Sequence, residues 1–149
     1  MNKSIQNSDE QLGFLLMQVT FLKQRLVNSA LRKRDITYIQ FVILAAALEL
    51  GEERKPVTQQ TIADERRLDK AMVSNVVKTL VAKGYLRREG HPTDKRAFTL
   101  ELTDPGKELA LEGKKIARQI DTGFFEGIDQ SAFQESLKTL LKNNNKRNE

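Results

Sequence analysis

The sequence contains no cysteine, and its only histidine is His91. The lack of cysteine excludes disulfide bonds, cysteine nucleophiles, thiolate zinc sites and thiol-based redox sensing. A lone histidine is not a metal-ligand cluster, so we expect no metal and no cofactor. The sequence also has no glycine-rich phosphate loop, and Glu52 and Glu53 fall in a polar loop rather than an apolar cleft. These absences argue against an enzyme.

Long hydrophobic runs are missing as well. No stretch approaches the ~18 consecutive apolar residues of a membrane-spanning helix, and the first four residues lack the hydrophobic region of a signal peptide. A chain of 149 residues is long enough for one domain with a core and too short for two. We therefore expect a single cytoplasmic domain, residues 1–149, with no membrane partner.

The positive charge of the chain is concentrated in one segment. Residues 66–96 hold nine basic side chains against three acidic ones, a net charge of +6, whereas the rest of the chain carries −1. A contiguous positive block is typical of a surface that binds phosphates. A solvated face with an accidental bias is the alternative, and charge alone does not decide between them.

Residues 9–31 predict a helix that is apolar on two faces. One row at three- and four-residue spacing comprises Leu12, Leu15, Leu16, Val19, Leu22 and Leu26, and a neighbouring row comprises Phe14, Met17 and Phe21. Such a helix is either deeply buried or packed against a partner chain. Because a small domain offers little depth, we favour a contact between two copies in a homodimer.

Capping signals mark the next helices. Thr37 and Gln40 form a capping box that opens a helix ending near Gly51, and Thr58 caps a short third helix. A fourth helix follows from Asp69. Its apolar stripe consists of Val73, Val76, Val77, Leu80 and Val81, and its opposite face carries Lys70, Ser74, Asn75 and Lys78.

A β-hairpin is expected after the fourth helix. Gly84 supplies the left-handed C-cap, and residues 85–89 and 98–102 predict two strands around a basic turn. Asp104 as N-cap and Pro105 at the first helical position predict a long helix, and a last helix is expected over residues 131–141. The aromatic side chains of Tyr38, Phe41 and Phe21 are interpreted as core.

A helix, a tight turn, a helix with a polar and basic outer face, and a basic hairpin follow the order of a winged helix-turn-helix. The outer face of the fourth helix would enter the DNA major groove. There Asn75 suits adenine, Lys70 or Lys78 could take guanine or phosphates, and Ser74 is less selective. For a lone helix, an ordinary solvated face would be the better interpretation. The adjacent hairpin favours DNA binding.

Three stretches of the sequence resemble the MarR family of bacterial regulators. Residues 36–41 are similar to the family's hydrophobic-Thr-x-x-Gln-aromatic opening of helix two, and residues 73–88 to its recognition helix and following strand. Residues 92–97 and 100–106 are similar to its D-x-R wing and Leu-x-Leu-Thr-x-x-Gly continuation. The resemblance covers residues 12–141, nearly the whole chain.

The resemblance implies a mainly α fold with a small β-hairpin wing. It implies a winged helix DNA-binding lobe over residues 36–103 and dimerisation helices over residues 9–31 and 104–141. The wing residues Thr93, Asp94, Lys95 and Arg96 would contact DNA, with Arg96 in the minor groove braced by Asp94. His91 and Asn75 depart from the aspartate and arginine common in the family, which leaves the target sequence open. His91 is expected to be an ordinary loop histidine, although phosphates beside it would raise its pKa.

The function implied is that of a dimeric regulator, expected to be a repressor, that binds an inverted repeat in double-stranded DNA. The family resemblance further implies a small aromatic or lipophilic effector held between the dimerisation helices and the DNA-binding lobe. An architectural DNA-binding protein, or a winged helix used for protein contacts, is the alternative, and it would show little preference for DNA sequence.

Overall fold

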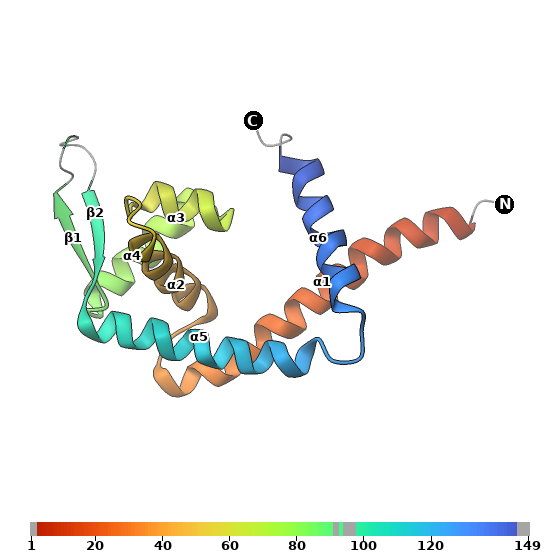
Figure 1. Ribbon diagram of the computed structural model, residues 1–149, viewed down its shortest axis with the longest axis horizontal. Helices are drawn as coiled ribbons and strands as arrows, with labels where there is room; N and C mark the ends of the chain where they lie inside the picture. The colour runs from red at the N-terminus through yellow and green to blue at the C-terminus, as the bar shows by residue number, and fades with distance from the viewer. Residues whose placement is uncertain (1–2, 91–92, 94–97, 146–149) are drawn as a thin grey trace.

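A computed structural model describes residues 3–90, 93 and 98–145. Within these residues the fold is mainly helical, with one two-stranded antiparallel sheet (Figure 1). The elements in chain order are α1 (Lys3–Leu31), η1 (Arg32–Arg34), α2 (Tyr38–Glu52), α3 (Gln59–Arg66), α4 (Lys70–Ala82), β1 (Leu86–Gly90), β2 (Phe98–Leu102), α5 (Asp104–Phe124) and α6 (Gln130–Asn144).

The capping signals in the sequence are confirmed at the start of α2 and α3. The Thr37 side chain accepts a hydrogen bond from the Gln40 backbone N–H, and the Gln40 side chain accepts one from the Thr37 backbone N–H. Thr58 caps α3, where Thr61 completes the capping box. Asp69 caps α4 by accepting from the backbone N–H of Met72. These hydrogen bonds satisfy N–H groups that have no partner inside the helix.

The predicted start of α5 is wrong by one residue. Thr103, and not Asp104, is the N-cap, because its hydroxyl accepts from the Gly106 N–H at 3.2 Å. The same hydroxyl donates to the Gly84 carbonyl oxygen at 2.6 Å. Pro105 therefore occupies the second helical position. Thr103 joins the end of α4 to the start of α5, a long-range contact that the local sequence does not reveal.

Helix α2 is the centre of the hydrophobic core. Eight of its side chains are buried, on every side of the helix: Phe41, Ile43, Leu44, Ala45, Ala46, Ala47, Leu48 and Leu50. They meet Val27 and Leu31 at the end of α1, Ile62 of α3 and Leu80 of α4. Each large side chain buried here contributes about 1.5–3 kcal/mol. This core fixes α3 and α4 on one side of α2 while α5 runs along another (Figure 1).

The β-hairpin projects from the same lobe. Its register pairs Leu86 with Leu102 and Gly90 with Phe98, so Leu86 and Leu100 face the core. The Leu100 N–H also donates to the carbonyl oxygen of Val57 at 2.7 Å, which ties the hairpin to the segment before α3. The hairpin is thus held at its base on two sides.

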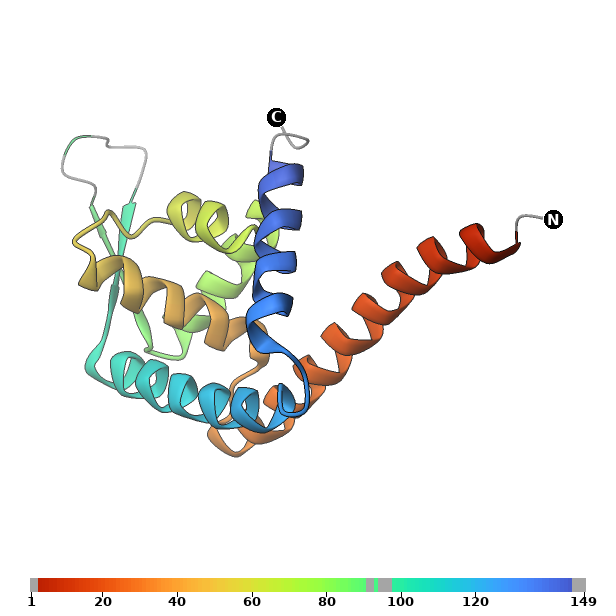
Figure 2. The same cartoon turned by 45° about the vertical axis from the view of Figure 1, so that its right-hand side comes forward.

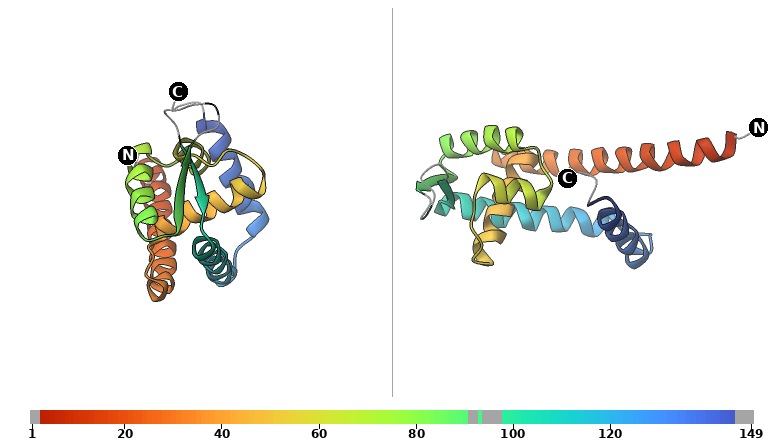
Figure 3. Two further views of the ribbon diagram at one scale, coloured as in Figure 1. Left: turned by 90° about the vertical axis from the view of Figure 1, so that its left-hand side faces the viewer. Right: turned by 90° about the horizontal axis from the view of Figure 1, so that it is seen from above.

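The outer part of α1 and all of α6 remain exposed. Helix α1 extends away from the body of the molecule, and α6, which overlaps it in Figure 1, stands apart from it in Figure 2. No residue of α6 is buried, and the two apolar rows of α1 are 41% to 70% exposed. The view from above in Figure 3 shows α1 running past the end of α5. The prediction that Phe21 is core is wrong for the single chain, since it is 58% exposed. None of the helices in the described part of the chain combines the length and the hydropathy that spanning a bilayer requires.

Candidate nucleic-acid interface

Helix α4 presents a polar face to solvent. Val73, Val77 and Leu80 are buried against the lobe, and this fixes the rotation of the helix about its axis. Asn75 and Lys78 are exposed on the opposite side, as the spacing predicts, whereas Ser74 is half-buried at the edge of that face. The prediction that Lys70 shares this face is wrong, because Lys70 precedes Val73 by three residues and Val77 by seven and so lies on their stripe; it is exposed because it is the first residue of the helix.

Two residues on the exposed face of α4 were missed in the sequence. Ala71 and Thr79 are exposed and share the face with Asn75. The helical period would have identified both residues. Ala71 was passed over because only polar side chains were considered, although its methyl group can contact the thymine methyl in the major groove. Thr79 also donates from its hydroxyl to the Asn75 carbonyl oxygen at 3.4 Å.

The turn between α3 and α4 is short and has a defined backbone conformation. Arg67 adopts the left-handed conformation with φ of 54°, and the Leu68 N–H donates to the Ala63 carbonyl oxygen at 2.9 Å. Beyond α4, Gly84 has φ of 81°, which confirms the predicted left-handed glycine, although the C-cap itself is Lys83, one position earlier. These two left-handed residues set the directions in which the chain enters and leaves α4.

The wing is described only in part. Thr93 is exposed, as a DNA-contacting residue must be. Asp94, Lys95 and Arg96 lie outside the described residues, and so does His91. The described strands below the turn carry Arg88, whose guanidinium lies 4.9 Å from the centroid of the Phe98 ring.

Several basic side chains of segment 66–96 are already engaged within the protein. Arg66 pairs with Glu49, Arg87 lies 3.1 Å from Glu101, and Lys83 donates to the Asp35 carbonyl oxygen. Glu101 raises the pKa of Arg87 through a hydrogen bond and its charge. Lys70 and Lys78 of α4, by contrast, form no ion pair with the part of the chain that is described. Within the described residues, Lys70 and Lys78 therefore keep positive charge that is not paired inside the chain.

A cavity of about 550 Å³ lies between α2, the turn after α3, and α5. Its apolar lining includes Tyr38, Phe41, Val42, Ala45 and Leu68, and its charged lining comprises Glu49, Arg66, Lys114, Arg118 and Asp121. Gly113 of α5 allows this packing, because a Cβ there would lie 2.4 Å from the Phe41 ring. Tyr38 and Phe41 thus belong both to the edge of the core and to the cavity wall.

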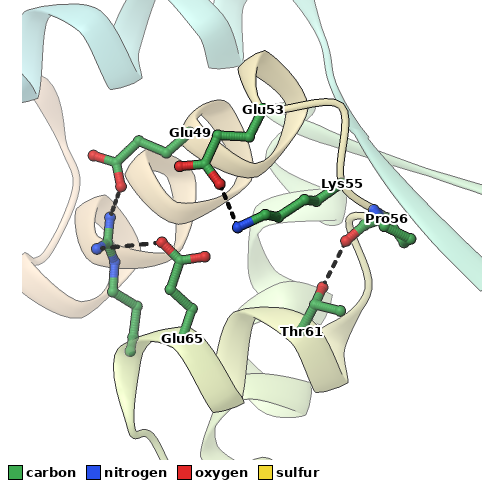
Figure 4. A network of polar contacts seen from close by, with 7 residues as sticks. Glu49, Glu53, Lys55, Pro56, Thr61 and Glu65 are labelled. Carbon is green, nitrogen blue, oxygen red and sulfur yellow. Dashed lines mark hydrogen bonds and ion pairs between the residues drawn. The ribbon is translucent and has the colours of Figure 1, made fainter.

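Glu49 connects the three elements around the cavity. One carboxylate oxygen lies against Arg66 at the end of α3, and the other lies 3.3 Å from Lys114 of α5. Figure 4 shows Glu49 and Glu65 reaching the same guanidinium group, which belongs to Arg66. Burial alone would raise the pKa of Glu49, but hydrogen bonds and charges from Arg66 and Lys114 lower it below its ordinary value. Within residues 3–90, 93 and 98–145, no cluster of acidic residues or histidine could hold a metal ion.

A short turn between two helices, an exposed polar face on the second, and a β-hairpin beside it define a winged helix-turn-helix DNA-binding protein. The family model that matches residues 34–97 describes the MarR family. The chain is 38% identical over 131 residues to the HTH-type transcriptional regulator YdcH of Bacillus subtilis, covering 87% of this chain and 89% of that protein. This chain belongs to the MarR family of transcriptional regulators.

Solved structures agree with that assignment. A mutant of Escherichia coli MarR complexed with operator DNA is similar to this chain with a TM-score of 0.76 and 25% identity, over 92% of this chain and 95% of that one. Bordetella bronchiseptica BpsR, whose DNA binding is regulated by 6-hydroxynicotinic acid, gives a TM-score of 0.77 and 26% identity, over 92% and 94%. The winged-helix fold predicted from the sequence is confirmed.

Proposed function

We propose that this protein is a homodimeric, non-enzymatic regulator that binds an inverted repeat in double-stranded DNA and responds to a small effector. The observation that carries the proposal is the exposed face of α4, with Asn75 and Lys78 beside the hairpin and Lys70 exposed at the start of the helix. An exposed helix of this chemistry fits the major groove and can read base edges there. Its expected effect is repression, in the cytoplasm where its target DNA lies.

The DNA-binding lobe is assigned to residues 36–103. Asn75 is the candidate for reading adenine, with Lys70, Ser74 and Lys78 as its neighbours on α4. We assign the wing residues Thr93, Asp94, Lys95 and Arg96 to the adjacent minor groove and phosphates. The operator complex of E. coli MarR supports this orientation by analogy of fold.

Dimerisation is assigned to residues 9–31 and 104–141. The apolar rows of α1, together with Leu140 and Leu141 of α6, expose more hydrophobic surface than a soluble monomer normally leaves in water. A second copy would cover this surface by an isologous contact and place two α4 helices on one face. Two helices related by such symmetry match an inverted repeat.

An effector is assigned to the cavity between α2 and α5. Its volume falls in the usual range for small-molecule sites, and aromatic and aliphatic side chains dominate its wall. The regulation of BpsR by 6-hydroxynicotinic acid supports a small aromatic molecule.

Two measurements test the proposal. Light scattering should give the mass of a dimer at micromolar concentration, and selection from random duplex DNA should enrich an inverted repeat. A folded monomer that enriches no sequence would contradict the proposal. A dimer that binds all duplexes equally would favour the architectural alternative, and a dimer that binds no duplex would favour a protein-contact module.

A further inference from the structure

Helix α4 contains no arginine. Its sequence from Lys70 to Ala82 holds two lysines, and only Lys78 lies on the outer face with Asn75. Arginine and lysine are the usual partners of guanine in the major groove, because they donate to its O6 and N7 acceptors. The outer face therefore has a single cationic side chain for guanine, and the other groups that it presents suit different bases.

Ala71, Asn75 and Thr79 form one row along the middle of this face. They follow each other at four-residue spacing, and all three are exposed. Residues at this spacing are about 6 Å apart along the helix axis. Successive base pairs of duplex DNA are about 3.4 Å apart. When α4 lies along the major groove, each residue of the row is therefore about two base-pair steps from the next.

The three side chains of the row present an amide between two methyl groups. Ala71 has only its methyl group to offer. The Thr79 hydroxyl donates to the Asn75 carbonyl oxygen at 3.4 Å, a bond that threonine commonly makes to the preceding helical turn. With its hydroxyl directed at the backbone, Thr79 presents its methyl group to a ligand. The Asn75 amide forms no hydrogen bond with the part of the chain that is described, so it is available to a base.

We propose that Ala71 and Thr79 determine specificity by contacting thymine methyl groups on either side of the adenine that Asn75 reads. This inference rests on the DNA binding proposed above and specifies the sequence class of the target, a half-site with a core of A·T pairs. The C5-methyl group of thymine is the apolar feature of a base edge in the major groove, and it packs against alanine and threonine methyl groups. Guanine and cytosine offer no methyl group there.

The test uses the full-length protein and deoxyuridine, which pairs as thymidine does but lacks the C5-methyl group. Selection from random duplex DNA should first give a half-site with thymine about two base pairs to each side of an adenine. Replacing either thymine of one half-site by deoxyuridine should lower wild-type affinity about fourfold, the value of burying one such carbon group. Fluorescence anisotropy on matched duplexes measures the loss.

Two variants assign each methyl contact to its residue. Thr79→Ser removes the methyl group and keeps the hydroxyl, so it should bind the thymine and deoxyuridine duplexes equally at one of the two positions. Ala71→Gly should do the same at the other position. A variant that only loosened α4 would weaken binding to both duplexes alike and keep their ratio. Thr122→Ser on α5 is the matched control and should keep the wild-type ratio, because Thr122 is exposed and its hydroxyl donates to the Arg118 carbonyl oxygen at 2.9 Å.

Three results would overturn the inference while leaving the proposed function intact. These are a selected inverted repeat with G·C pairs at the core of each half-site, wild-type affinity that deoxyuridine changes at no position, and a deoxyuridine loss that Thr79→Ser and Ala71→Gly both keep in full. Failure of the proposed function looks different, because the wild type would then enrich no DNA sequence. That result would overturn the inference together with the function on which it rests.

Discussion

Gly113 determines how closely α5 approaches α2 at the wall of the cavity between these two helices. A Cβ at this position would lie 2.4 Å from Cδ2 of the Phe41 ring, so Gly113→Ala must push that ring aside. We expect a loss of about 1–3 kcal/mol in the free energy of unfolding, measured by urea denaturation, because the site is already close-packed. Gly123→Ala in the same helix is the control. Nothing in the described part of the chain lies within 4 Å of a Cβ there, so alanine should gain up to about 1 kcal/mol from helix propensity. Equal effects of the two variants would contradict this account.

Asn75 is expected to read one base pair. It lies exposed at the middle of the outer face of α4, and its amide can donate to and accept from adenine at once. Asn75→Ala should cost about 1–3 kcal/mol at one position of the operator and relax the preference there. Binding to single-base variants of the selected operator measures this. The control is Asn143→Ala, the same change at an exposed site on α6, and an intact base preference in Asn75→Ala would show that Asn75 is ordinary surface.

At the scale of the elements, Thr103 is the joint between the hairpin and α5. Its hydroxyl accepts from the Gly106 N–H and donates to the Gly84 carbonyl oxygen. Thr103→Val removes both bonds at nearly constant volume and should cost about 1–3 kcal/mol of stability. Asp104→Ala should cost only about 0.3–1 kcal/mol, since Asp104 contributes its charge to the first turn and no cap. A larger loss of thermal stability in Asp104→Ala than in Thr103→Val would show that Asp104 is the cap.

The contact between η1 and α5 makes stability depend on pH. Arg34 donates from Nε to Oε1 of Glu112 at 2.8 Å, and this hydrogen bond lowers the pKa of Glu112 below its ordinary value. A carboxyl whose pKa is lowered by folding stabilises the protein at pH values above its pKa in the unfolded chain. This contribution is lost as the pH falls through the pKa of the same group in the folded protein. The unfolded pKa of a glutamate is about 4.3, so denaturation at a series of acidic pH values should show a smaller loss below this pH for Glu112→Gln than for the wild type. Glu108→Gln, at an exposed carboxylate of α5 with no ion pair among the described residues, should match the wild type.

Local signals explain why most elements could be predicted. The capping box at Thr37, the cap at Thr58 and the glycine after Lys83 all act within a few residues, and the structure confirms each. The Thr103 cap was missed because its second bond goes to Gly84, 19 positions away. The burial of α2 on every side was not predicted, although residues 41–48 form an unbroken apolar run that covers every side of the helix.

The candidate sites also divide into those made of residues close together in the sequence and those that only folding brings together. The exposed face of α4 follows from helical period alone, so Asn75 and Lys78 were placed on it in advance. The ionic junction at Glu49 was not, since Arg66 and Lys114 come from two other elements and only folding brings them together. For the same reason, the net charge predicted for residues 66–96 included Arg66 as an unpaired cation.

The whole molecule should bind DNA with a salt dependence set by its unpaired cations. Lys78 is exposed on α4 without an ion pair in the described part of the chain, whereas Lys83 is tied to Asp35 through its carbonyl oxygen at 2.8 Å. Both lie in the basic segment, and replacing either by glutamine removes one charge.

Each lysine that displaces counterions from a phosphate adds about 1 to the slope of log affinity against log salt. Lys78→Gln should therefore reduce the slope by about 1 per half-site, and Lys83→Gln should leave it nearly unchanged. Fluorescence anisotropy on the selected operator at several salt concentrations measures both slopes, after dimerisation and folding have been checked for each variant. Equal reductions would mean that net charge alone governs binding, and a nearly flat wild-type slope would remove the phosphate contacts from this surface.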